Sequence, residues 1–187
     1  NLPYIYLDVI LYSKKIQDNI TNYLQLHILT RIFDKITESK EYYASLGGSG
    51  FNIKISSDYL VLEFRSYPDI IDKFIDEYLD ILINIRDNPE TIKYFDFVKK
   101  EYHDDLENIK YLDLTKMVNL LFREKVYDKY YTFNECLDNI QDIKYHDLRI
   151  PDFYKMNLCI FGNITKNDSI KRDDKFNKFI NTFFQQI

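Results

Sequence analysis

Tryptophan is absent from the 187-residue sequence, and glycine, proline, cysteine and methionine are rare, with four, four, two and two copies. The two cysteines, Cys136 and Cys159, are too few for a disulfide framework and lack the spacing of a metal site. We therefore interpret both as reduced packing residues. No apolar run approaches the roughly 18 residues of a membrane-spanning helix, so we expect no membrane span.

Clustered positive charge is also lacking. The formal net charge is −5, and the short basic pairs Lys14-Lys15 and Lys171-Arg172 lie near acidic residues. Nucleic-acid-binding proteins usually present a clustered basic surface. We therefore interpret both pairs as solvated surface and expect no nucleic-acid partner.

The start of the chain, Asn1-Leu2-Pro3, has neither an initiator methionine nor a signal-like apolar run. We interpret the chain as a segment excised from a longer polypeptide, whose own targeting signal could lie in the missing part. For the chain itself we expect a cytoplasmic location.

The sequence does contain ample material for a core. Hydrophobic residues make up 45% of the chain and charged residues 29%, with 17 tyrosines and 14 phenylalanines. A chain of this length forms one large domain or two small ones. Because no internal repeat, low-complexity tract or flexible linker divides it, the sequence predicts a single domain over residues 1–187.

Apolar periodicity predicts the elements and their order. Three of the four glycines fall within residues 47–50, which predicts the end of a helix over 18–40 and a tight turn into a strand. This order favours an α+β fold with helices packed on one face of a largely antiparallel sheet. Strands are predicted over 4–12, 51–55 and 60–65, and a short buried strand is predicted over 156–161. Further helices are predicted over 113–127 and 169–185, and from three start signals: Pro68, an Asn88-Pro89 cap and a Thr132–Glu135 capping box.

This arrangement resembles the insulinase-like (pitrilysin) zinc metallopeptidases over about residues 4–170. No single motif carries the resemblance; the placement of several short ones does. They are the helix end Glu41-Tyr42-Tyr43-Ala44-Ser45-Leu46-Gly47-Gly48, the helix after Tyr67-Pro68, the spacing of Phe95, Lys99 and Tyr102, and the stretch Leu158-Cys159-Ile160-Phe161-Gly162-Asn163-Ile164-Thr165-Lys166.

The resemblance implies a parent built from four similar α+β domains, whose two halves close around a peptide. Zinc and the catalytic residues would lie in the first domain, on H-x-x-E-H plus a downstream glutamate. This chain looks like the third domain, which would build the chamber wall and cleave nothing. Its partners would be the N-terminal catalytic half and the fourth domain of the same polypeptide, together with the parent's peptide substrates.

The zinc motif needs two imidazoles on one helix face. His27 lies in the helix over 18–40, but Tyr23 stands four residues before it and Arg31 four residues after it. His103 lies among acids that we interpret as a solvated helix face, with a metal site as the alternative, and His146 lacks a spaced partner. We therefore predict no catalytic residue, no metal ligand and no cofactor in this chain, and leave its substrate-contacting residues unassigned.

Other patterns have plainer interpretations. The acids over residues 69–80 are typical of the polar face of an amphipathic helix, and the glycine cluster lacks the Lys-Ser/Thr of a phosphate-binding loop. The many tyrosines could furnish a peptide-contacting surface or ordinary packing. Two rival functions stay open: an inactive homologue that serves as a structural subunit of a larger complex, and an unrelated α+β interaction domain.

Overall fold

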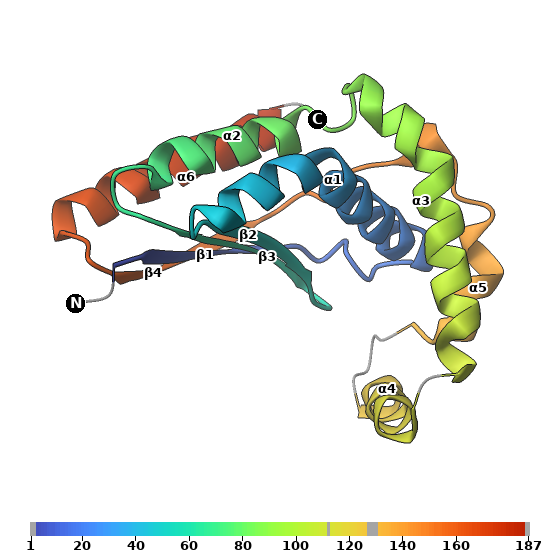
Figure 1. Cartoon of the computed structure of the whole chain (residues 1–187). Helices are drawn as coiled ribbons and strands as arrows, with labels where there is room; N and C mark the ends of the chain where they lie inside the picture. Colours follow the sequence, from blue (N-terminus) through green and yellow to red (C-terminus); the bar gives the residue numbers. More distant parts are fainter. Residues whose placement is uncertain (1–2, 112, 127–130, 186–187) are drawn as a thin grey trace.

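The computed structural model describes residues 3–111, 113–126 and 131–185, and it places helices against one face of a sheet (Figure 1). The elements are β1 (Ile5–Tyr12), α1 (Ile20–Leu46), β2 (Gly50–Ile55), β3 (Tyr59–Ser66), α2 (Ile71–Ile83), α3 (Pro89–Asn108), a 3-10 turn (Ile109–Tyr111), α4 (Leu114–Val126), α5 (Phe133–Ile140), a second 3-10 turn (Tyr145–Asp147), β4 (Lys155–Gly162) and α6 (Lys166–Gln185).

The sheet has the strand order β2-β3-β1-β4, and each neighbouring pair is antiparallel. Side chains alternate between its two faces. On β1 the inward residues Ile5, Leu7, Val9 and Leu11 are at most 1% exposed, whereas the residues between them are not buried. The predicted α+β class, with helices on one face of a largely antiparallel sheet, is confirmed.

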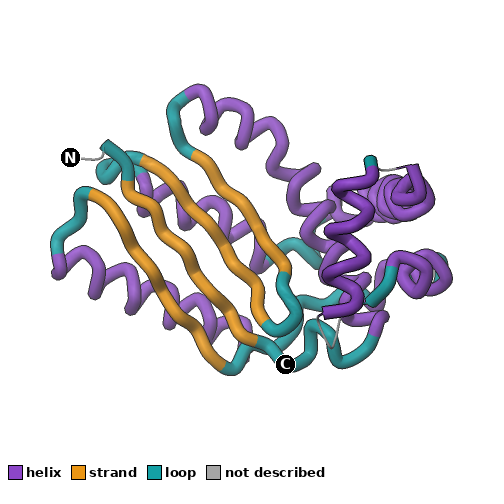
Figure 2. Tube along the Cα trace, turned by 90° about the horizontal axis from the view of Figure 1, so that it is seen from below, coloured by secondary structure: helices purple, strands orange, loops and turns teal. Residues whose placement is uncertain are grey.

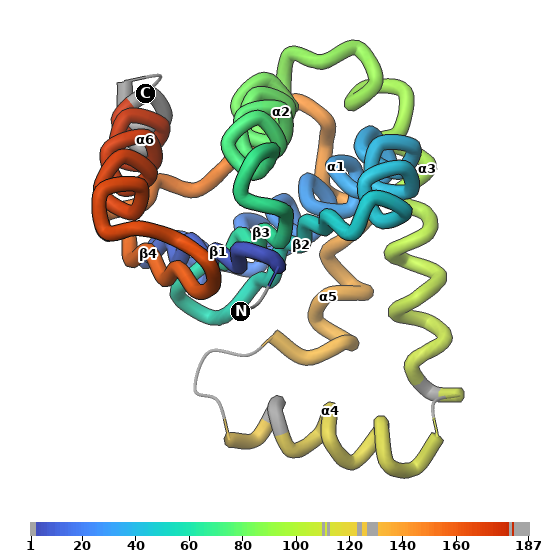
Figure 3. Tube along the Cα trace, turned by 60° about the vertical axis from the view of Figure 1, so that its left-hand side comes forward, coloured from blue at the N-terminus to red at the C-terminus, as the bar shows by residue number. Residues whose placement is uncertain are grey.

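Helices α1, α2 and α6 lie over the inward face of the sheet (Figures 1 and 3). Their apolar stripes meet the inward side chains in an aromatic-rich core, in which the ring centroids of Phe33 on α1 and Phe51 on β2 are 5.3 Å apart. The ring of Tyr78 on α2 lies 4.7 Å from Phe51. Seen from below, the opposite face of the sheet is covered by none of the helices that the structure describes (Figure 2).

Helix α1 begins where Asn19 accepts a hydrogen bond from the Asn22 backbone N–H at 2.8 Å. It extends to Leu46, six residues beyond the end that periodicity predicts, and stops at Gly47 as the glycine cluster indicates. Gly48 then takes a φ of 78°, a left-handed conformation that favours glycine. The polar residues after position 40 weaken the apolar stripe without breaking the helix, which explains the early predicted end.

Two predicted helix caps are present. Asn88 accepts from the Glu90 backbone N–H at 3.0 Å, with Pro89 in the first turn of α3. Thr132 and Glu135 form a reciprocal capping box at the start of α5. Helices α3 and α5 pack at one end of the molecule, and α4 stands apart from the layers beside them (Figures 1 and 3).

Besides the end of α1, three predicted boundaries or environments were wrong. The strand predicted as buried is β4, an edge strand whose side chains are half-buried or exposed, because only β1 flanks it. The helix predicted from Pro68 begins at Ile71, after a turn in which Tyr67 accepts from the Ile71 backbone N–H at 3.0 Å. The last helix begins earlier than predicted, at Lys166.

Across the part of the chain that the structure describes, no helix combines the length and the apolar character needed to cross a membrane.

Candidate functional site

The imidazole that sequence inspection places in the first helix packs between two helices. The His27 ring lies 4.4 Å from the Tyr23 ring on α1 and 5.8 Å from the Tyr102 ring on α3. Burial of the imidazole, reinforced by the positive charge of Arg31, lowers the pKa of His27 to about 4. His27 is therefore held neutral by its surroundings, as suits a packing residue.

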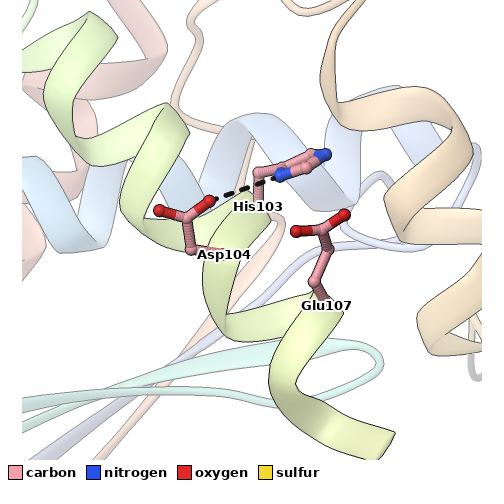
Figure 4. A group of neighbouring side chains, drawn as sticks. All are labelled: His103, Asp104 and Glu107. Carbon is pink, nitrogen blue, oxygen red and sulfur yellow. Dashed lines mark ion pairs between the residues drawn. The ribbon is translucent and has the colours of Figure 1, made fainter.

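His103 lies beside two acids on α3 (Figure 4). The ligand atoms of His103, Asp104 and Glu107 all come within 4.8 Å of one another, and His103 Nδ1 lies 3.6 Å from an Asp104 carboxylate oxygen. The group offers one imidazole and two exposed carboxylates from a single helix. A catalytic zinc is typically held by two or three imidazoles, which this set does not fit.

The third histidine lies far from the other two in the chain. His146 Nε2 lies 3.5 Å from its sequence neighbour Asp147, on a side chain that is 73% exposed. Within the described ranges the structure therefore brings no two histidines together in a group that could hold a metal. That the chain carries no metal and no catalytic residue stays a prediction.

The open face of the sheet combines aromatic and charged side chains. Because the strands are in register, its outward residues form rows that cross the four strands. In strand order β2-β3-β1-β4 these rows are Gly50, Arg65, Tyr6 and Phe161; Asn52, Glu63, Asp8 and Cys159; Lys54, Val61, Ile10 and Asn157; and, over the last three strands, Tyr59, Tyr12 and Lys155.

Two carboxylates face each other at the centre of this open face. Asp8 and Glu63 are directly paired across β1 and β3. Burial raises the pKa of Asp8, and the charge of Glu63 adds to the rise, against an opposing effect of Lys54. Burial also acts to raise the pKa of Glu63, but hydrogen bonds from Lys54 at 2.5 Å and Asn52 at 2.9 Å outweigh it and hold that pKa below its ordinary value.

Aromatic clusters with cations flank the acidic centre. At one end the Tyr4 ring lies 4.7 Å from Tyr67 and 6.4 Å from Tyr6, and the Arg65 guanidinium lies 5.7 Å from Tyr4. At the other end Tyr12 and Tyr59 have ring centroids 5.7 Å apart, and Lys155 Nζ lies 5.2 Å from Tyr12. Tyrosines of this kind offer apolar area with a polar end, which suits contact with a polypeptide.

The sequence could predict only part of this surface. Alternation assigns Tyr6, Asp8 and Tyr12 to one strand face, and the structure confirms that assignment. The clusters escaped prediction because Tyr67 and Lys155 join them from distant segments, and their placement depends on the strand register. Periodicity along one strand carries no signal for that register.

The chain is similar to known proteins in both sequence and fold. The family model described as the middle or third domain of peptidase M16 matches residues 1–139. No curated protein sequence matches the chain. In fold it is similar to pitrilysin, with a TM-score of 0.75 and 13% identity over 98% of this chain and 19% of that one.

Two further solved structures are similar over less of the fold. The periplasmic protease PqqL from Escherichia coli has a TM-score of 0.57 and 10% identity, over 79% of this chain and 17% of that one. A chain of Complex III2 from Candida albicans, bound to Inz-5, has a TM-score of 0.54 and 12% identity, over 90% of this chain and 40% of that one.

This chain thus spans about a fifth of the length of pitrilysin and of PqqL. The M16 peptidases carry other domains in the same polypeptide, as the family description of a middle domain requires. The match over residues 1–139 and the pitrilysin-like fold lead to one assignment: the chain belongs to the insulinase-like M16 peptidase family, as its middle or third domain.

Proposed function

We propose that this chain is a non-catalytic domain from the C-terminal half of a zinc metalloendopeptidase, and that its open sheet face forms part of the wall of a peptide-enclosing chamber. The observation that carries the proposal is the open face itself, where tyrosines surround a charged centre and no helix covers the strands (Figure 2). Residues 1–187 would act as one domain within a longer polypeptide.

The zinc and the residues that activate water would belong to an N-terminal domain of that polypeptide. The donor set of this chain supports this division, since its His103 group has one imidazole and does not fit a catalytic zinc. What the chain would supply is enclosure: a chamber that closes around a peptide keeps the substrate near a catalytic centre built elsewhere. The cytoplasmic location stays a prediction.

The exposed face of α4 supports a contact with another part of the same polypeptide. Its large apolar side chains Leu114, Val118, Leu121 and Phe122 are 44–80% exposed. Apolar side chains gathered on one helix face are typical of an interaction surface. We assign this face to the packing of the domain against the catalytic half or the fourth domain.

The test compares this chain with the longer polypeptide that contains it. We expect the longer polypeptide to hydrolyse a fluorogenic peptide and to lose that activity on addition of a chelator, whereas the purified chain neither hydrolyses the peptide nor retains stoichiometric zinc.

A second measurement tests the open face. In the longer polypeptide, Tyr6→Ser and Tyr12→Ser should raise KM with little change in kcat, because they remove contacts that bind the substrate and the transition state equally. The matched control is Tyr111→Ser, at an exposed tyrosine far from the sheet. Chelator-sensitive hydrolysis by the chain alone would contradict the proposal.

A second function, a structural subunit of a larger complex, is favoured by the likeness to a chain of Complex III2. Under this alternative the longer polypeptide lacks chelator-sensitive hydrolysis and co-purifies in a stable assembly. Measurement of hydrolysis and of native mass on the same preparation separates the two functions.

A further inference from the structure

A cavity of about 460 Å³ opens between three segments that are distant in the sequence. Its walls come from the first turns of α1, the turn after α2 and the loop that leads into β4. Its size lies within the range of pockets that bind small ligands, about 300–1,000 Å³. It lies apart from the open sheet face, since none of the outward strand residues lines it.

One polar side chain of this cavity belongs to a largely buried residue and has no hydrogen-bond partner among the described residues. Gln25 on α1 is 6% exposed and lines the cavity, and its amide makes no hydrogen bond to any described residue. Its amide atoms are not among the described side-chain atoms that are fully enclosed without a partner, so they are open to the space of the cavity. Gln25 therefore presents a donor and an acceptor to whatever enters the cavity.

Two guanidinium groups at the rim are also unpaired. Arg86 and Arg149 both line the cavity and are exposed, and neither side chain forms an ion pair with a described residue. The turn that carries Arg86 is fixed by its backbone carbonyl, which accepts a hydrogen bond from the Tyr145 hydroxyl at 2.7 Å. A guanidinium group that has no partner suits a carboxylate, which it binds through two parallel hydrogen bonds.

The other charged residues of the cavity do not cancel its preference for a carboxylate. Lys15 and Asp152 form an ion pair with each other at the rim, and Asp18 supplies one further carboxylate. The cations of the lining therefore exceed its carboxylates by one, in a chain whose net charge is −5. The cavity is a locally positive site on an acidic protein, which favours an anionic ligand.

The inner wall of the cavity is apolar. Leu29, Ile85, Leu148 and Phe153 line it and are between 1% and 4% exposed. A ligand that fits must present an apolar group to this wall, a hydrogen-bonding group to Gln25 and a carboxylate to the two arginines. The C-terminal residue of a peptide combines all three when its side chain is apolar.

We propose that this cavity binds the free C-terminus of a peptide that ends in an apolar residue. The terminal carboxylate lies between Arg86 and Arg149, the terminal side chain lies against the wall formed by Leu29, Ile85, Leu148 and Phe153, and the Gln25 amide bonds the peptide backbone. The site is independent of the proposed chamber, because it needs no cleavage and no second domain.

The probe is N-acetyl-Ala-Leu with a free carboxylate, titrated into the chain against its C-terminal carboxamide. We expect the acid to bind at least about tenfold more tightly by calorimetry, since charge-assisted hydrogen bonds are about twice as strong as neutral ones. In NMR spectra the side-chain amide of Gln25 should shift on titration. The double variant Arg86→Gln/Arg149→Gln should lose the preference for the acid, and Gln25→Met should weaken both forms.

The matched control is Arg65→Gln, at an exposed arginine on the open sheet face, which should bind both peptides as the parent chain does. Both rim arginines are exposed, so their replacement should leave the unfolding curve unchanged, and a circular dichroism melt verifies this. Equal binding of acid and carboxamide, an absence of saturable binding, or binding of acetate as tight as that of the peptide acid would each overturn the proposal. Because the readout is binding, its failure is separable from failure of the chamber function, which is read from hydrolysis.

Discussion

Two adjacent glycines show how one backbone angle decides the consequence of a substitution. Gly47 has a φ of −82°, which any residue adopts, whereas Gly48 has a φ of 78°. A Cβ at Gly48 would also lie 2.8 Å from the Tyr4 hydroxyl, while at Gly47 the nearest atom is the Ala44 carbonyl oxygen at 3.4 Å. The two positions therefore form a matched pair.

We predict that Gly48→Ala lowers the free energy of unfolding by about 1–2 kcal/mol, the usual cost of a left-handed conformation for a residue with a Cβ. Gly47→Ala should change it by less than about 0.5 kcal/mol, because its backbone needs no adjustment. Urea unfolding measures both. Equal effects of the two substitutions would contradict the assignment of the left-handed residue.

The half-buried imidazole of His27 links stability to pH. Its pKa is about 4 in the folded chain and 6.5 at its ordinary value, so between these values the unfolded chain binds a proton that the folded chain does not. The stabilisation is complete above about pH 6.5 and is lost as the pH falls toward 4. The expected loss by pH 4 is about 3 kcal/mol, since each unit of difference in pKa is worth about 1.4 kcal/mol.

Comparison of His27→Gln with the parent chain isolates this contribution, because all other titrating groups are common to both. The variant should have a flatter dependence of unfolding free energy on pH between 4 and 6.5, values that bracket the His27 titration. His146→Gln, at an exposed histidine, should keep the slope of the parent chain. A slope that is unchanged in the His27 variant would show that this imidazole titrates normally.

At the scale of elements, two ion pairs join α2 and α6, the helices that cover the centre and one edge of the sheet, and the cation of one pair is buried. Arg172 on α6 is 6% exposed, and its Nε and Nη2 donate to the Asp72 carboxylate on α2 at 2.8 and 3.0 Å. Removal of the carboxylate leaves a buried cation without compensation. The two hydrogen bonds and the burial of Arg172 distinguish this ion pair from ion pairs between exposed side chains.

We predict that Asp72→Ala destabilises the chain by about 1–3 kcal/mol, the usual cost of leaving a buried donor without its partner. The control on the same helix is Glu77→Ala, which removes a 4.0 Å contact with Lys73 between largely exposed side chains. That substitution should cost less than about 0.5 kcal/mol. Thermal melts of both variants suffice, and equal losses would refute a special role for the α2–α6 pair.

Helix α4 should behave differently from the helices of the core. Phe122 on α4 is 62% exposed, whereas Phe95 on α3 is 7% exposed. We expect Phe122→Ser to change the unfolding free energy of the chain by less than about 0.5 kcal/mol, and Phe95→Ala to cost about 3–5 kcal/mol. A core-sized loss at Phe122 would show that α4 packs back onto the domain in solution.

Local sequence patterns predicted those elements well whose structure depends on residues close together in the chain. Strand β1 alternates because one of its faces is covered, and Asn88 and Thr132 cap helices through contacts within three residues. The environment of β4 could not be predicted in this way. Its position at the edge depends on strand order, which residues 156–161 do not encode by themselves. The rows of the open face depend on register for the same reason.

At the scale of the whole molecule, the predicted absence of a resident metal has a direct test. We expect a chelator to leave the melting temperature of the purified chain unchanged, because a donor set with one imidazole binds zinc weakly. Excess zinc should likewise leave it unchanged, since a ligand that binds the folded state raises stability with its concentration. A rise with added zinc that His103→Gln abolishes would reveal a site on α3.

The family could be identified from sequence because its short motifs keep their order along the chain, even though identity to pitrilysin is 13%. The helix end at Gly47, the hairpin and the turn after Gly162 each mark a boundary between elements, where backbone geometry restricts the residue type. The candidate site had no such signal. Its members are ordinary surface residues that only the folded arrangement brings together.

The central position of β1 in the sheet also constrains how the protein is made. One edge of β1 pairs with β3, but the other pairs with β4, which lies near the far end of the chain. During synthesis, the second edge of β1 has no strand partner until residues 155–162 have left the ribosome. Such long-range pairing slows folding and leaves an edge open to association with other chains. Nascent chains of this domain should therefore depend on chaperones until β4 emerges.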